Sequence, residues 1–380
     1  MRDLVILGST GSIGVQALEV VAANPTAFNV VAISAYGSNP ALIIEQARTF
    51  KVQVIGVVIN ADVIREALPG VAVIDGPTAA SEVAAITCEV VLNGITGSIG
   101  LGPTLAALEV GNKLALANKE SLVAAGELVM SRAAENQLIP VDSEHSAIWQ
   151  SALAGKKSEI SKLVLTASGG PFRNRRDLSD VTIAEALAHP TWEMGQVVSI
   201  NSATLMNKSL EIIEAHYLFD MPYRQIEAVI HPQSIVHSMV EYVDGSTLAQ
   251  LSPPNMKGPI SYAINWPVRL PGATKTMDWS QQHTLEFEPI DNERFPVIEL
   301  ALRCGELGGG LPAIFNAANE VAVAAFLAGQ ISFTAIVESV DLTVQKLGSA
   351  VNPIRDLADV SAIENDARKV AGEIIERVAK

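Results

Sequence analysis

Short apolar runs alternate with amphipathic segments over the first third of the chain. The apolar runs cover residues 4–7, 30–34, 54–59, 71–74, 90–92 and 114–117. Between such runs, segments 13–23 and 40–50 repeat their apolar residues with the period of a helix. Continuous apolar strands that alternate with helices are typical of a parallel sheet covered on both faces. The pattern predicts an N-terminal Rossmann-like, doubly wound parallel sheet, assigned to residues 1–144.

The pattern changes after this region. A strand is predicted at residues 163–166, and the apolar runs 235–243 and 247–251 flank Asp244-Gly245, a strong hairpin signal. Residues 145–265 are therefore expected to form a second, catalytic α/β domain. The proline-containing stretch 266–292 has little periodicity and is predicted to be a linker. Residues 293–380 are Ala-rich and punctuated by glycines, which predicts a small C-terminal bundle of three or four helices.

A long polar stretch, residues 171–195, interrupts the second domain. It contains one short predicted helix, where Thr182 and Glu185 fit a capping box and Pro190 forces the stop. Loops of this length inside a compact domain are usually functional lids or disordered. We predict a lid in which Trp192, beside His189, could close over a short phosphorylated chain, although such residues more often only dock a loop.

Composition narrows the class of protein. The 380 residues carry a net charge of −15, which argues against nucleic acid or an anionic membrane as a partner. The only two cysteines, Cys88 and Cys304, cannot build a disulfide framework or a thiolate metal site. With no signal peptide, transit peptide or spanning segment recognisable in the sequence, a cytoplasmic location is expected.

A glycine turn follows the first predicted strand. Gly8, Gly11 and Gly14 would let the backbone approach a pyrophosphate, and the following helix start supplies N–H groups and a positive dipole. The spacing is not the usual G-x-G-x-x-G, and a plain tight turn is the alternative, but the position favours a dinucleotide. The second strand ends at 36–39 without the acidic residue that NAD-binding proteins use for the ribose. NADPH is therefore favoured over NADH.

Two carboxylates lie two residues apart beyond the apolar run 138–141. In an extended segment, Asp142 and Glu144 would point to one side, where like charges repel unless a cation lies between them. An ordinary surface strand end is the alternative, and it would be preferred for the pair alone.

A helix predicted to start near Ser202 favours a cation site over an ordinary strand end. Ser202 is a plausible N-cap, and Met206, Leu210, Ile213 and Tyr217 form an apolar stripe along the helix. The polar side carries Asn207, Lys208 and Glu211 at helical spacing, which suits a phosphate and a third carboxylate ligand. A capped, solvated helix with one ion pair is the alternative for this segment taken alone. Oxygen ligands without Cys or His indicate Mg²⁺ or Mn²⁺.

Taken together, these segments closely resemble the 1-deoxy-D-xylulose 5-phosphate reductoisomerase family. The ordered matches are GSTGSIG at 8–14, ANKE at 117–120, PVDSEHSAI at 140–148, SGGPF at 168–172, HPTWxMG at 189–195, SATLMNKxLE at 202–211 and HPQS at 231–234. The resemblance implies a homodimeric, NADPH-dependent oxidoreductase of non-mevalonate isoprenoid biosynthesis, with residues 145–265 also serving dimerisation. It would convert 1-deoxy-D-xylulose 5-phosphate to 2-C-methyl-D-erythritol 4-phosphate by a metal-assisted rearrangement followed by hydride transfer.

The resemblance also implies roles for individual residues. The metal ligands would be Asp142, Glu144 and Glu211, which together with Lys119 and His189 form the expected catalytic set. Substrate contacts are expected from Lys119, Ser143, Glu144, Ser168, His189, Trp192, Ser202, Asn207, Lys208 and Glu211. The cofactor would lie against Gly8, Thr10, Gly11, Ser12, Ile13, Gly37, Ser38, Asn39, Asn118, Glu120 and Gly195. This chain differs from many members of the family at one position. Ser38 stands where those members have a basic residue.

Two other classes of protein remain as alternatives. A semialdehyde or acyl-phosphate reductase can share the glycine turn and NADPH, but it needs a cysteine nucleophile paired with a base. A non-catalytic NADPH-binding protein would explain the turn and leave the three carboxylates and the phosphate donors without a purpose.

Overall fold

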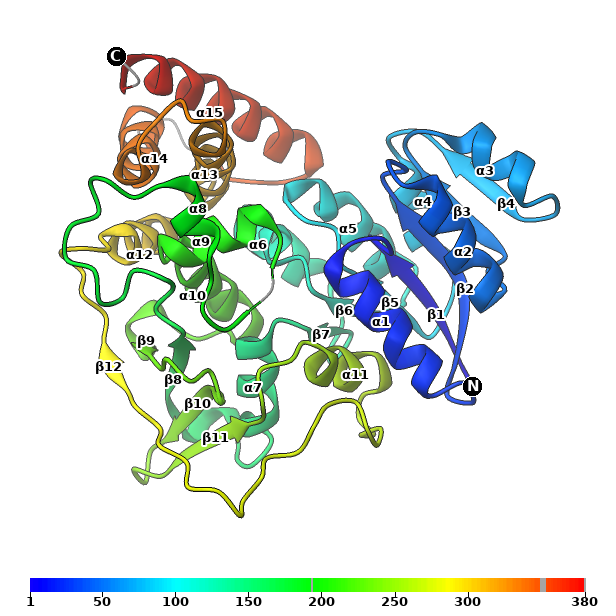
Figure 1. Cartoon of the computed structure of the whole chain (residues 1–380), viewed down its shortest axis with the longest axis horizontal. Helices are drawn as coiled ribbons and strands as arrows, with labels where there is room; N and C mark the ends of the chain where they lie inside the picture. Colours follow the sequence, from blue (N-terminus) through cyan, green and yellow to red (C-terminus); the bar gives the residue numbers. More distant parts are fainter. Residues whose placement is uncertain (193, 349–352, 379–380) are drawn as a thin grey trace. The chain divides into compact units, whose positions relative to one another are not determined.

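The computed structural model describes residues 1–192, 194–348 and 353–378 (Figure 1). The chain forms two compact units, each assembled from several stretches of sequence. The first unit holds residues 1–121, 129–146 and 255–275, and the second holds residues 122–128, 147–254 and 276–380. Within the expected lid, Glu193 lies outside the described residues, as do 349–352 and 379–380 within the expected bundle.

The first unit is built on a seven-stranded parallel sheet in the order β4-β3-β2-β1-β5-β6-β7. Its strands are β1 (Arg2–Leu7), β2 (Phe28–Ala35), β3 (Val54–Val57), β4 (Ala72–Asp75), β5 (Val90–Asn93), β6 (Lys113–Leu116) and β7 (Leu138–Pro140). The helices are α1 (Ser12–Ala23), α2 (Pro40–Phe50), α3 (Ala61–Ala67), α4 (Ala79–Ala84), α5 (Leu101–Glu109), both ends of α6 (Lys119–Arg132) and α11 (Lys257–Asn265).

This sheet confirms the predicted Rossmann-like, doubly wound fold. The strand order reverses between β1 and β5, and ligands of such sheets bind at the carboxyl ends of the strands beside that point. Leu4, Ile6, Ile33 and Leu92 are fully buried, as expected for strands with helices on both faces. The sheet therefore holds the glycine turn after β1 and the segments after β2, β5 and β6 at one edge.

The second unit is built on a mixed five-stranded sheet in the order β11-β10-β8-β9-β12. Its strands are β8 (Ile160–Ala167), β9 (Ile226–Ile230), β10 (Val236–Tyr242), β11 (Thr247–Leu251) and β12 (Glu288–Pro289). β8 and β9 are parallel, whereas β10 runs antiparallel to both β8 and β11. The Asp244-Gly245 hairpin is confirmed, because the Tyr242 amide donates to the carbonyl of Ser246 and the Gly245 amide to that of Tyr242.

Helices make up the rest of the second unit. They are α7 (Ser143–Ala152), which begins in the first unit, α8 (Ile183–Leu187), α9 (Gln196–Ala203), α10 (Met206–Phe219), α12 (Val297–Leu307), α13 (Leu311–Leu327), α14 (Phe333–Leu347) and α15 (Leu357–Val378). The last four form the predicted C-terminal bundle, drawn from yellow to red in Figure 1. Its core includes Leu300, Phe315, Ile336 and Ala371.

The units do not follow contiguous stretches of sequence. Helix α11, expected within the 145–265 domain, packs in the first unit, and the chain then returns to the second. The stretch 266–292, expected to be a linker, contributes β12, which pairs with β9. Among residues 1–192, 194–348 and 353–378, the structure has no helix with the length and apolarity that a bilayer crossing requires.

Candidate active site

The glycine turn joins β1 to α1 in the first unit. Gly8 has a φ of +77°, and a Cβ there would lie 2.8 Å from the carbonyl oxygen of Gly94. A Cβ on Gly14 would lie 2.3 Å from the carbonyl oxygen of Gly8, so glycine at both positions allows the helix start to pack against the turn. Gly11 and Ser12 are exposed at that helix start. This is the geometry that the sequence predicts for a pyrophosphate site.

The segment after β2 is adjacent to this turn in the sheet order. Gly37 is buried with a φ of +104°, and a Cβ there would meet the carbonyl oxygen of Ile59 at 2.2 Å. Ser38 and Asn39 are exposed, and the Asn39 side chain caps α2 by accepting from the Leu42 amide. Two exposed polar side chains therefore follow β2, with no carboxylate between residues 35 and 40 to repel a 2′-phosphate.

Asn118 lies where β6 meets α6. Its side-chain oxygen caps α6 by accepting from the Ser121 amide at 3.1 Å. Its Nδ2 atom donates to the carbonyls of Ile95 and Gly97 at 2.7 and 2.8 Å, and to Glu120 Oε2 at 3.0 Å. Asn118 therefore ties the loop after β5 to the start of α6, which carries Lys119 and Glu120.

The carboxylate pair differs from its predicted backbone form. Asp142 and Glu144 do not lie in an extended segment, because α7 begins at Ser143 and the Asp142 carbonyl accepts from the Ser146 amide. Acidic and hydroxyl side chains favour a helix start because they compensate exposed N–H groups and the helix dipole. The two carboxylates still offer oxygens within 4.8 Å of each other. The close pair is confirmed, and the strand geometry expected for it is wrong.

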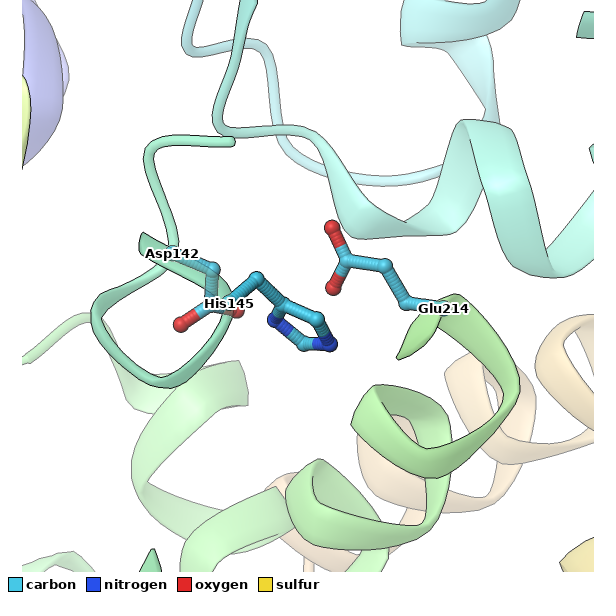
Figure 2. Close-up of side chains that lie close together, drawn as sticks. All are labelled: Asp142, His145 and Glu214. Carbon is cyan, nitrogen blue, oxygen red and sulfur yellow. The ribbon is translucent and has the colours of Figure 1, made fainter. Parts of the chain in front are cut away.

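Positive charge and a hydroxyl lie against this pair. The ammonium of Lys119 lies 2.5 Å from Asp142 Oδ2, and both side chains are largely shielded from solvent, with 14% and 12% exposed. The Ser143 hydroxyl donates to Glu144 Oε2 at 2.6 Å. Figure 2 shows Asp142 and the neighbouring His145 projecting from the start of α7.

In the second unit, the helix predicted from Ser202 is two helices. Ser202 lies in the last turn of α9 and is not an N-cap, and Leu205 adopts a φ of +59° before α10 starts at Met206. The prediction was wrong because Val197, Val198 and Ile200 extend the helical pattern backwards, while Thr204 breaks it. The Thr204 hydroxyl bonds the Ile200 carbonyl at 3.0 Å and accepts from the Met206 amide at 3.3 Å.

The charged residues on the polar side of α10 are buried and not solvated, and Asn207 beside them is partly buried. The predicted apolar stripe is confirmed, because Met206, Leu210 and Ile213 are buried and Tyr217 is partly buried against the same core. Lys208 and Glu211 are also buried, with side chains 4% and 1% exposed, and they form an ion pair. Asn207 donates a second hydrogen bond to Glu211. The solvated alternative is thereby excluded, and Asn207 and Lys208 occupy the first turn of a helix.

A serine and a histidine meet on the same unit. The loop after β8 carries Ser168, whose Oγ lies 2.9 Å from Nε2 of His189 and accepts from the Gly170 amide at 3.2 Å. A Cβ on Gly170, which has a φ of +63°, would lie 2.8 Å from the Ser202 carbonyl. The structure thus brings the predicted residues Ser168, His189 and Ser202 to one region.

Much of the expected lid is packed. Phe172, Leu178, Val181 and Ala186 are buried in the core of the second unit. Arg175 forms ion pairs within the segment, with Asp180 and Glu185, and the capping box of Thr182 and Glu185 is confirmed. An open pocket of about 490 Å³ lies beside the remainder, lined by Leu187, Ala188, His189, Trp192, Met194 and Ser199. Gly195, an expected cofactor residue, is exposed at the start of α9.

His237 belongs to none of the motifs that the sequence analysis singled out. It is buried on β10, with Nε2 3.0 Å from the Ser252 hydroxyl, and burial lowers its pKa to about 4. Its ring lies 6.3 Å from that of Trp192, centroid to centroid. A neutral histidine therefore lies under the lid tryptophan, and no spacing rule in the sequence could have found it. Glu214, one turn beyond Glu211 on α10, is likewise buried, and Figure 2 draws its side chain.

Neither cysteine is suited to act as a nucleophile. Burial raises the pKa of Cys88 to about 11 and that of Cys304 to about 12. A thiolate is the reactive form, and both environments disfavour it. The acyl-phosphate reductase alternative therefore lacks its essential group.

Together, the parallel sheet, the glycine turn at its switch point and the carboxylate-bearing helices define a dinucleotide-binding oxidoreductase. A family model for 1-deoxy-D-xylulose 5-phosphate reductoisomerase matches residues 4–126, and two models of its C-terminal domain match residues 138–219 and 251–370. The chain belongs to this family.

Relatives of the same description span nearly the whole chain. The reductoisomerases of Streptomyces coelicolor and Leifsonia xyli are 51% and 54% identical, covering 100% and 99% of this chain and 94% and 99% of those proteins. The structure of the Zymomonas mobilis enzyme in complex with NADPH is 39% identical, with a TM-score of 0.92 and 99% coverage of both chains. A reductoisomerase crystal structure with NADPH, fosmidomycin and magnesium is 36% identical, with a TM-score of 0.93, covering 99% of this chain and 98% of that one.

Proposed function

We propose that this chain converts 1-deoxy-D-xylulose 5-phosphate to 2-C-methyl-D-erythritol 4-phosphate, with NADPH as hydride donor and a divalent cation. The observation that carries the proposal is the buried polar side of α10, where Asn207 and Lys208 at the helix start adjoin the buried carboxylate of Glu211. Burying such a set costs free energy unless each charge is compensated, so a helix that serves only packing would not retain it. Family membership supplies the reaction that these groups fit.

The proposed metal ligands are Asp142, Glu144 and Glu211. Their chemistry fits Mg²⁺ or Mn²⁺, since all three offer carboxylate oxygens and no soft donor. Asp142 and Glu211 each face a lysine ammonium, which supports a site that favours positive charge. The reductoisomerase structures in complex with magnesium support the use of a divalent cation.

The proposed substrate contacts divide between the phosphate and the reacting carbons. Ser202, Asn207 and Lys208, at the junction of α9 and α10, would bind the phosphate, because a helix start and a buried ammonium both favour an anion. Ser168 and His189 would bind it from the side of the lid. Lys119, Ser143 and Glu144 would contact the reacting end, near the proposed metal ligands.

The proposed cofactor contacts follow the edge of the parallel sheet. The pyrophosphate would lie on the turn formed by Gly8, Thr10, Gly11, Ser12 and Ile13, and the adenosine end on Gly37, Ser38 and Asn39. Asn118, Glu120 and Gly195 would contact the nicotinamide end. The structure of the Zymomonas mobilis enzyme in complex with NADPH supports this use of the fold.

When bound, the divalent cation would supply Lewis-acid stabilisation of negative charge on the substrate oxygens, and NADPH would supply the hydride. The chain's own residues orient the substrate and shield it from water. Lys119 can stabilise negative charge at the substrate oxygens and move a proton there. His189 holds the lid backbone through its Nδ1 atom, and Trp192 lines the pocket, where closure of the lid would shield the substrate from water. We further propose that residues 145–265 carry the contacts of a homodimer and that the protein is cytoplasmic.

The test is NADPH oxidation on addition of 1-deoxy-D-xylulose 5-phosphate, with and without Mn²⁺ or Mg²⁺. The proposal expects turnover only with substrate and metal together. Asp142→Asn and Glu211→Gln should abolish turnover while NADPH still binds, measured by fluorescence titration. Full activity in excess chelator would overturn the metal assignment, and NADPH binding without turnover under any condition would support the non-catalytic alternative.

A further inference from the structure

Helix α13 carries two buried asparagines in an otherwise apolar sequence. Asn316 and Asn319 are each 1% exposed, one turn apart on the same helix. Asn316 donates to Glu320 Oε1 at 3.2 Å, so that contact stays within α13. Asn319 instead donates to the side-chain oxygen of Asn201 on α9 at 3.1 Å. One asparagine serves its own helix, whereas the other reaches the helix that ends beside the proposed phosphate site.

The bond to Asn201 continues into the α9–α10 junction. The Thr204 hydroxyl lies 3.3 Å from the main-chain carbonyl of Asn201 and accepts from the Met206 amide at 3.3 Å. Met206 is the first residue of α10, directly before Asn207 and Lys208. A connected set of hydrogen bonds thus runs from α13 to the first turn of α10 and passes the residue next to Ser202.

The loop that carries Gly170 contacts the α9–α10 junction from another side. The Gly170 loop approaches so closely that a Cβ there would lie 2.8 Å from the Ser202 carbonyl. With Gly170 against the Ser202 backbone and Asn319 against the Asn201 side chain, the end of α9 is held from two directions. A small displacement of α9 would move the Ser202 hydroxyl relative to Asn207 and Lys208.

Packing alone does not account for Asn319. Its side-chain oxygen is buried and has no hydrogen-bond partner among the described residues. A buried amide with an unpaired group costs stability, and an apolar residue of similar volume would avoid that cost. The hydrogen bond to Asn201 is therefore the contact that an asparagine provides at this position and an apolar residue would not.

We propose that Asn319 is a positioning residue for the substrate-phosphate site, acting through Asn201 to fix Ser202 and the start of α10. The inference rests on the proposed phosphate role of Ser202, Asn207 and Lys208. It assigns the C-terminal helical bundle a part in substrate recognition, although no residue of α13 need touch the ligand.

The test compares Asn319→Leu with the matched control Asn316→Leu, an equally buried asparagine one turn away. Asn319→Leu should raise the KM for 1-deoxy-D-xylulose 5-phosphate about tenfold, the effect of misplacing one phosphate contact, and raise the Ki of inorganic phosphate by the same factor. The KM for NADPH and kcat should change less than about twofold. Asn316→Leu should leave all four constants near the parental values.

A double-variant cycle supplies the decisive readout. If Asn319 acts through Asn201, adding Asn319→Leu to Asn201→Ala should cause no further rise in KM, whereas independent effects would multiply. Equal changes in KM and Ki for Asn319→Leu and Asn316→Leu, or unchanged constants in Asn319→Leu, would overturn the proposal. If Asn319→Leu does not fold, Asn319→Ser takes its place with the same expectations.

The proposed reaction and the positioning role of Asn319 can be refuted separately. If the parental protein does not turn over the substrate, the proposed reaction is wrong, and calorimetric titration of inorganic phosphate into the same variants tests the positioning role. Weaker phosphate binding in Asn319→Leu, but not in Asn316→Leu, would then support it. Equal binding in both variants, or no phosphate binding in the parent, would overturn it.

Discussion

The hydroxyl oxygen of Ser168 lies 2.9 Å from Nε2 of His189, and the contacts of the other ring nitrogen decide which of the two atoms donates. Nδ1 of His189 accepts from the amides of Thr191 and Trp192 at 3.1 and 2.9 Å, so it carries no proton in this arrangement. The proton is therefore on Nε2, which donates to Ser168. Because Ser168 Oγ also accepts from the Gly170 amide, its own proton is directed to a further acceptor, which suits a phosphate oxygen.

This arrangement predicts a loss of activity in acid that depends on His189. Burial lowers the pKa of His189 below its usual value near 6.5. The neutral ring is thus favoured in the fold, and its stabilising effect is present above that value and lost as pH falls towards the lowered pKa. Protonation of Nδ1 removes two acceptor contacts to the lid backbone, so kcat/KM should fall on the acid side.

The measurement is the pH dependence of kcat/KM in the parent and in His189→Gln. The variant should be less active at neutral pH and should lack the part of the acid limb that belongs to the histidine. The substrate phosphate also titrates in this range, and the variant retains that contribution as an internal control. An acid limb of the same shape in both proteins would contradict the assigned role.

Replacing Lys208 should weaken substrate binding and reduce stability together. Lys208→Ala removes a charge-assisted phosphate contact of about 1.5–3 kcal/mol, which corresponds to a KM about 10- to 100-fold higher. It also leaves the buried Glu211 carboxylate without its ammonium partner, at a cost of about 3 kcal/mol in the free energy of unfolding.

Thermal melting with and without Mg²⁺ separates these effects. A divalent cation bound by Glu211 should restore part of the lost Tm of Lys208→Ala, and Glu211→Gln in the same background should abolish that restoration. The exposed pair of Lys157 and Asp220 offers the control Lys157→Ala, for which less than about 1 kcal/mol is expected. If Lys208→Ala keeps the parental KM, Lys208 does not bind the phosphate.

Cofactor preference should favour NADPH, and Ser38→Arg should strengthen it. Ser38 is exposed after β2, so an arginine there can reach a 2′-phosphate without disturbing the core. A partly solvated pair of this kind is worth ~1 kcal/mol, or about fivefold in the ratio of kcat/KM for NADPH to that for NADH. Ser38→Ala serves as the control for loss of the hydroxyl. Equal kcat/KM for the two cofactors in the parent would refute the preference.

Lid closure should be confined to the part of the segment around Trp192 and Met194. Residues such as Phe172 and Val181 are already buried, and Arg294 donates to the carbonyl of Arg175 at 2.8 Å. Trp192 fluorescence should therefore change on adding fosmidomycin, with Trp192→Phe correcting for the other three tryptophans. Trypsin cleavage at Arg175 should be slow with and without ligand. An unchanged Trp192 signal at saturation would show that the segment does not close.

Local patterns predicted much of the fold. Apolar runs located the parallel strands of the first unit, and Asp244-Gly245 located the β10–β11 hairpin, because both depend on neighbouring residues. The assembly of the units was not predictable in this way. Helix α11 joins the first unit across more than 100 residues of intervening chain, and that choice depends on tertiary packing.

The candidate site, like the fold, was predictable only where local sequence patterns determine it. The residue types around Asp142 and Glu211 indicated an oxygen-ligand site, and the ordered motifs indicated the family. The sequence could not show that Ser202 ends one helix while Met206 begins the next, because Leu205 adopts a left-handed conformation that leucine rarely takes. Nor could it show the burial of His237 or the hydrogen bond between Asn201 and Asn319. Both depend on contacts between residues that are distant in sequence.

The central claim is tested most directly by following deuterium from labelled NADPH into the product of 1-deoxy-D-xylulose 5-phosphate, in the presence of Mg²⁺ or Mn²⁺. Rearrangement followed by hydride transfer predicts one deuterium per NADPH oxidised, on the carbinol carbon next to a newly branched, methyl-bearing centre, as read by NMR. Glu211→Gln should give no such product. A linear polyol with deuterium at the original carbonyl carbon, or undiminished turnover in excess chelator, would contradict the account.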